Sequence, residues 1–87
     1  MVYLFIYSND FGDREAVKTI LNGMPEIVDW RYDLPNTFYL ESEEEADKLA
    51  DLIIEQKADA RFLLVEVSKN RQGWLPKATW EFLNRNS

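Results

Sequence analysis

The chain has 87 residues, of which 46% are hydrophobic and 14% aromatic, and its net charge is −6 at pH 7. This length and composition predict one folded domain with a small core. The absence of cysteine and histidine excludes disulfides, thiolate zinc sites and every catalytic system that depends on an imidazole.

The predicted elements begin with a strand at Val2–Tyr7, where every residue is apolar or aromatic. Such a run is typical of a central strand that is covered on both faces. Residues 13–23 follow with apolar side chains at helical spacing. Gly23 and Pro25 end this helix, because glycine favours the position after a helix and proline cannot continue one.

The rest of the chain repeats the pattern of a helix between strands. Five segments follow: a half-buried strand at 27–32, a turn at 33–36, a partner strand at 37–41, an amphipathic helix at 42–56 and a strand at 61–67. The strand at 27–32 is predicted to alternate, with Val28, Trp30 and Tyr32 on one face and Asp29 and Arg31 on the other. The second helix is predicted to start with a capping box, in which Ser42 and Glu45 each bond the other's backbone amide. Residues 68–87 form a C-terminal extension that includes a short helix from Lys77.

The order strand, helix, strand, strand, helix, strand predicts an α+β, ferredoxin-like (βαββαβ) domain that spans residues 1–87. Its four strands form one antiparallel sheet. Both helices cover the same face of that sheet, because crossover connections are right-handed. The extension at 68–87 is a tail or an extra strand that covers the sheet.

The aromatic residues of the first strand predict an interface. If the even-numbered residues face the helices, Tyr3, Phe5 and Tyr7 lie together on the opposite face. Three aromatic side chains exposed side by side mark an interaction surface. Either Trp74 and Trp80 of the tail cover this patch in the same chain, or a second protomer covers it. We therefore expect a homodimer that pairs these faces or exchanges the tail.

Asp10, in the segment YSNDFGDREA that follows the first strand, has two interpretations. A carboxylate just past the end of a central strand suits magnesium, and two protomers would bring two Asp10 side chains together to cut a phosphodiester. Alternatively, Asp10 or Asn9 caps the first helix, and Gly12 permits the tight turn before it. Only the first interpretation needs a metal, and we expect no other cofactor.

Charge is unevenly divided along the chain. Residues 1–56 carry 13 acidic and 4 basic residues, whereas residues 57–87 carry 3 acidic and 6 basic residues. The acidic run at 43–45 is either a solvated first helical turn or a mimic of phosphates. The tail carries four cations that alternate with Trp74 and Trp80: Lys69, Arg71, Lys77 and Arg85. These cations either contact a nucleic-acid backbone or form the outer face of an amphipathic tail.

Four stretches resemble the SinR-like family of small proteins: YLFIYSND, DWRYDLPNTFYL, RFLLVEVS and KNRQGWLPKATWEFLN. That family is similar to the small ferredoxin-like CRISPR-associated proteins that serve as the dimeric subunit of the spacer-integration complex, and VapD-type ribonucleases share the fold. The resemblance implies a homodimer in which the C-terminal strand reaches the partner. Relatives proposed as nucleases end the first strand with a Tyr-Asp pair. This chain has Tyr7 and Ser8 there, and its nearest carboxylate is Asp10.

The sequence therefore predicts a small, non-catalytic homodimeric module that binds protein or nucleic acid. The alternatives are a magnesium-dependent endonuclease with paired Asp10 residues, and an acidic inhibitor protein from a mobile element. No run approaches the length of about 18 apolar residues that a membrane span needs, and the first residues are typical of a strand rather than a signal peptide. We expect a cytoplasmic protein without a membrane partner.

Overall fold

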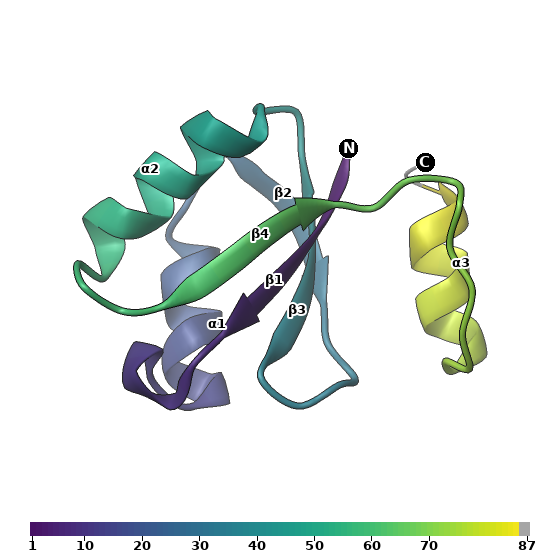
Figure 1. Cartoon of the computed structure of the whole chain (residues 1–87), viewed down its shortest axis with the longest axis horizontal. Helices are drawn as coiled ribbons and strands as arrows, with labels where there is room; N and C mark the ends of the chain where they lie inside the picture. The colour runs from purple at the N-terminus through teal and green to yellow at the C-terminus, as the bar shows by residue number, and fades with distance from the viewer. Residues whose placement is uncertain (86–87) are drawn as a thin grey trace.

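A computed structural model shows the fold and describes residues 1–85. Four antiparallel strands form one sheet in the order β2-β3-β1-β4. Helices α1 and α2 lie on one face of this sheet and α3 lies on the other (Figure 1). This is the ferredoxin-like arrangement that the sequence predicts, with an added helix. The elements in chain order are β1 (Val2–Tyr7), a 3-10 turn η1 (Asn9–Phe11), α1 (Arg14–Asn22), β2 (Ile27–Arg31), β3 (Thr37–Ser42), α2 (Ala46–Gln56), β4 (Phe62–Glu66) and α3 (Lys77–Arg85).

The main core lies between the sheet and the helices α1 and α2. Tyr3, Phe5 and Tyr7 of β1 belong to it and are at most 6% exposed. Their buried neighbours come from all the elements of this layer except β4: Phe11, Val17, Leu21, Met24, Ile27, Phe38, Leu40, Leu49 and Ile53. The prediction that Tyr3, Phe5 and Tyr7 face away from the helices is therefore wrong. The odd-numbered side chains of β1 point to α1 and α2, and the three rings form no exposed patch.

The opposite face of the sheet carries a second, smaller core under α3. Four residues that are at most 4% exposed form it: Val2, Tyr39, Phe82 and Leu83. Trp80 of α3 packs against this cluster, so the tail covers its own sheet in this chain. Trp74 does not, because it is 91% exposed. The helix predicted from Lys77 is confirmed, and the last two residues of the predicted extension lie outside the described residues.

Helix α1 begins three residues later than a cap at Asp10 would require. Asp13 is its N-cap, and Oδ1 of Asp13 accepts a hydrogen bond from the Ala16 amide at 2.9 Å. This bond satisfies one of the backbone amides that have no partner in the first helical turn. The prediction that Asp10 or Asn9 caps α1 is therefore wrong, because both residues lie in η1.

Helix α2 begins without the predicted capping box. Ser42 is the last residue of β3, and its hydroxyl is buried. The hydroxyl donates to the Glu26 carbonyl at 2.8 Å and accepts from the Glu44 amide at 3.1 Å. The N-cap position belongs instead to Glu45, whose side chain caps nothing. The Ser42 hydroxyl thus ties β3 to the segment before β2, and it is not available for the box.

Candidate functional site

Asp10 lies at the corner where β1 ends. Its Oδ1 accepts a hydrogen bond from the Ser8 hydroxyl, and its Oδ2 lies 3.6 Å from Nε of Arg61, just before β4. The Arg61 amide also donates to Oδ1, at 3.4 Å. The Ser8 hydrogen bond, helped by Arg61, holds the pKa of Asp10 below its ordinary value. The carboxylate therefore fastens the end of β1 to the start of β4.

The surroundings of Asp10 do not assemble a metal site within one chain. Across residues 1–85, no three histidine, cysteine, aspartate or glutamate side chains come together as ligands. A cation at Asp10 would also have to displace the guanidinium of Arg61. Gly12 has a φ of 127°, and a Cβ there would lie 3.1 Å from Cβ of Ala16, so the tight turn requires glycine. The geometry supports a structural role for Asp10, and a metal shared between two protomers stays a prediction.

Lys69 and Arg71 are the two predicted basic residues that the fold brings together. Both border one hollow at the end of α3. Arg71 donates to the Ser68 carbonyl and to Oδ1 of Asn84, each at 3.1 Å. One of these guanidinium bonds joins the loop after β4 to the end of α3, so Arg71 helps to hold the loop against the helix.

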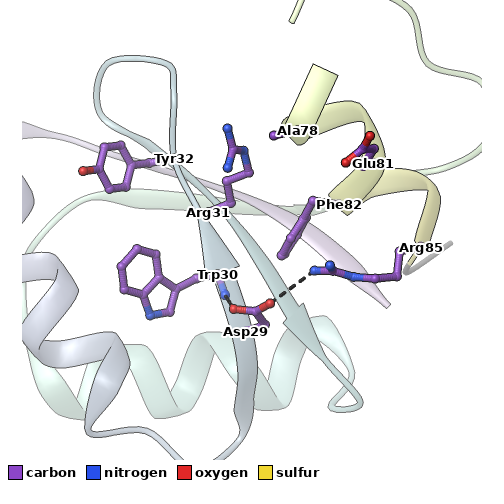
Figure 2. Close-up of a pocket in the computed structure, with 8 residues that line it drawn as sticks. All are labelled: Asp29, Trp30, Arg31, Tyr32, Ala78, Glu81, Phe82 and Arg85. Atoms are coloured by element: carbon purple, nitrogen blue, oxygen red, sulfur yellow. Dashed lines mark hydrogen bonds and ion pairs between the residues drawn. The ribbon is translucent and has the colours of Figure 1, made fainter. Parts of the chain in front are cut away.

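The other two cations of the tail lie elsewhere. Nζ of Lys77 lies 3.9 Å from Oε1 of Glu81, one turn further along α3. Arg85 donates to Oδ2 of Asp29 on β2 at 3.2 Å, as Figure 2 shows. The four cations therefore form no continuous track, and two of them are paired with carboxylates.

A buried polar contact seats α3 on the sheet. The Thr79 hydroxyl is fully buried, accepts from Nε of Arg31 at 2.6 Å and donates to Oδ2 of Asp33. The other oxygen of Asp33 accepts from the Tyr39 hydroxyl at 3.0 Å. Burial first, and then the Asp33 carboxylate, raises the pKa of Tyr39 above its ordinary value. We call Arg31, Asp33, Tyr39 and Thr79 the polar seam.

The strand β2 presents different side chains to its two sides. In Figure 2, Arg31 and Asp29 lie on the side of α3, while Trp30 and Tyr32 point the other way. Trp30 and Tyr32 pack against the main core, so the alternation predicted for these four residues is confirmed. Val28, predicted on the face of Trp30, is 62% exposed. The pairing of β2 with β3 is irregular between Ile27 and Asp29, and this displaces Val28 from the pattern.

An apolar groove lies between the sheet and the segment that leads to α3. Its volume is about 320 Å³, and its walls include Leu4 of β1, Leu34 of the β2–β3 turn and Trp80 of α3. Trp74 also lines it, although 91% of this side chain is exposed. We call this surface the Trp74 groove. The sequence singled out Trp74 and Trp80 but not Leu4 and Leu34, because their meeting depends on where α3 packs.

Beside the Trp74 groove, the half of this sheet face over β4 is uncovered. Ile6, Leu63 and Val65 are 41%, 57% and 44% exposed. Ile6 pairs with Leu63 across the sheet, and Leu4 pairs with Val65. We call Ile6, Leu63 and Val65 the open strip. Sequence reasoning missed it because it assigned the even-numbered side chains of β1 to the helices.

Fold and surface together define a small α+β domain of ferredoxin-like topology that presents an apolar groove and an uncovered apolar strip. Comparison of the chain with protein-family models, curated proteins and solved structures found no match. The resemblance to SinR-like, CRISPR-associated and VapD-type proteins therefore stays a prediction. Each helix in residues 1–85 is too short or too polar to cross a membrane.

Proposed function

We propose that the protein is a non-catalytic binding module that holds an apolar segment of a partner protein in the Trp74 groove. The observation that carries this proposal is the 91% exposure of Trp74 at the rim of a groove with apolar walls. Tryptophan is enriched among the residues that dominate binding energy, because it buries a large area with few rotatable bonds. A partner side chain placed between Trp74 and Leu4 would remove both from water.

A protein partner fits this surface better than a nucleic acid. Nucleic-acid affinity comes mainly from several cations that contact phosphates together. Of the four cations of the tail, Lys77 and Arg85 are paired with carboxylates, and Lys69 and Arg71 are the two that share a hollow. The net charge of −6 also repels a polyanion at long range.

Peptide selection tests the proposal. Short random peptides displayed on phage would be selected on the wild-type protein and counter-selected on Trp74→Ala, which removes the rim of the groove. Peptides that survive would be synthesised, labelled and titrated by fluorescence anisotropy. We expect apolar anchor residues in them and a loss of affinity of roughly 30-fold in Trp74→Ala, which corresponds to about 2 kcal/mol.

Two controls make the outcome decisive. Val28→Ala removes another exposed apolar side chain, on β2, and should bind the peptides as the wild type does. A labelled polyuridine strand should bind weakly, and Lys69→Ala should change little. The proposal is wrong if no peptide survives counter-selection, or if the RNA binds tightly and loses affinity with salt and with Lys69→Ala.

A further inference from the structure

The strand β4 forms one edge of the sheet. Among residues 1–85, it is the last strand and pairs only with β1, so its outer edge carries unpaired backbone groups. The amide of Val67 donates to the Val2 carbonyl at 2.8 Å, and the Arg61 carbonyl accepts from the Ser8 amide at 3.0 Å. Because these groups alternate along an antiparallel strand, the odd-numbered residues of β4 bond to β1. The amides and carbonyls of Phe62, Leu64 and Glu66 therefore point out of the sheet.

The other edge of the sheet is protected in ways that β4 is not. β2 follows Pro25, pairs irregularly between Ile27 and Asp29, and carries charged side chains. Proline, bulges and charges are devices that prevent one sheet edge from pairing with another. Residues 62–65, in contrast, read Phe-Leu-Leu-Val, and their pairing with β1 is regular.

Apolar side chains flank the free edge on both faces of the sheet. On the α3 side lie Leu63 and Val65 of the open strip. On the side of α2, a hollow of about 700 Å³ runs beside β4, and its lining includes Ala46, Ala50 and Ile54 beside the charged Asp47, Asp59 and Arg61. Ile54 is 47% exposed. A strand added to β4 would be covered above and below by these side chains.

We propose that β4 pairs antiparallel with β4 of a second copy of this chain, with Leu64 opposite Leu64. A twofold axis perpendicular to the sheet keeps side chains of the same parity on the same face. With Leu64 on that axis, Leu63 faces Val65 of the second copy and Phe62 faces Glu66. The outward groups of these residues then form about six backbone hydrogen bonds.

A second copy fits this edge better than an unrelated peptide because the strand is complementary to itself. The pairing centred on Leu64 uses all five residues of β4 and places Leu63 against Val65 twice. The same axis brings two α2 helices side by side, and Ala46 and Ala50 permit a close approach. The interface goes beyond the proposed function and uses residues that do not line the Trp74 groove.

The first test exchanges charges across the predicted register. Leu63→Lys and Val65→Glu each place one charge on the half-exposed strip and should leave the fold intact, as thermal unfolding would verify. We expect the wild type to sediment as a dimer at millimolar chain concentration. Each variant alone should dimerise roughly 30-fold more weakly or worse. An equimolar mixture of the two should recover a heterodimer, because lysine at 63 then faces glutamate at 65.

Matched controls separate this register from others. A mixture of Leu63→Lys and Leu63→Glu should not recover a dimer, because position 63 does not face position 63. Val28→Lys on β2 should dimerise as the wild type does. A monomeric wild type, a dimer unchanged by Leu63→Lys, or recovery only in the 63–63 mixture would overturn the proposal.

Amide hydrogen exchange provides a second measurement. The Leu64 amide points out of the sheet and should be protected only in the dimer, whereas the Val65 amide bonds to β1 and should be protected in both states. Slow exchange of Leu64 in wild type and fast exchange in Leu63→Lys would support the proposal. Equal exchange of Leu64 in the two proteins would refute it. Leu63→Lys should still bind the selected peptides as the wild type does. The dimer proposal and the groove proposal can therefore be refuted separately.

Discussion

Replacement of Thr79 by valine tests whether the polar seam stabilises the packing of α3. Thr79→Val keeps the volume and branching of a fully buried side chain but removes the hydroxyl that joins Arg31 to Asp33. Each hydrogen bond to a charged group contributes about 1.5–3 kcal/mol. Because Arg31 and Asp33 are only partly buried, water can replace part of the lost hydrogen-bond energy in the variant. We expect the free energy of unfolding to fall by about 2 kcal/mol, and Tm by roughly 8–16 °C for a domain of this size.

The assay is urea unfolding followed by circular dichroism, with Thr79→Ser as the matched control. Thr79→Ser keeps both hydrogen bonds and loses one methyl group, which costs about 1 kcal/mol. Thr79→Val should therefore be the less stable of the two, although it is the more hydrophobic. If Thr79→Val is as stable as Thr79→Ser or more stable, the seam does not stabilise α3 in the way that its geometry indicates.

Three further predictions concern other parts of the molecule. Ionised Asp10 should stabilise the fold above its ordinary pKa of 3.8, because its pKa is lowered in the folded state. The difference in urea midpoint between wild type and Asp10→Asn should then shrink as the pH falls through the folded-state value, and a difference that persists in stronger acid would contradict this. Phe5→Ala should lower the free energy of unfolding by about 3–5 kcal/mol, because Phe5 is fully buried. This loss is comparable to the whole free energy of unfolding of a domain this small, so a variant that circular dichroism shows to be fully folded would argue against it. Added salt should strengthen the proposed dimer, since each copy carries a net charge of −6, and sedimentation at low and high salt would detect the opposite trend.

The order and type of the elements could be predicted because they depend on local patterns. Strands are marked by apolar runs or by alternation, and helices by apolar residues three or four positions apart. The structure confirms each element within a few residues. The faces of β1 could not be predicted in the same way. Val2–Tyr7 is apolar at every position, so alternation does not distinguish one face from the other. Both faces are covered, one by α1 and α2 and one in part by α3 (Figure 1).

The failed capping predictions have one physical cause. A serine or aspartate near the start of a helix can bond several backbone groups, and tertiary structure selects among them. Ser42 bonds the Glu26 carbonyl because β3 extends to residue 42. Asp10 bonds Ser8 and Arg61 because η1 separates it from α1. Local sequence does not show that Glu26 lies beside Ser42 or Arg61 beside Asp10. The capping pattern therefore predicts helix amides as partners where the fold supplies other groups.

The polar seam and the open strip belong to one arrangement. The polar contacts that fasten α3 to the strands of the sheet come from the β2 side: Asp29 binds Arg85, and Arg31 binds Thr79, a residue 48 positions away along the chain. These contacts hold α3 toward β2 and β3, and its apolar side chains therefore cover Val2 and Tyr39 rather than β4. Because a nine-residue helix cannot span the whole face, the half over β4 stays bare. If the polar seam sets the position of α3, then Thr79→Val should allow α3 to shift over β4 and reduce the exposure of the open strip. Thr79→Val should then dimerise more weakly than the wild type when both proteins are equally folded.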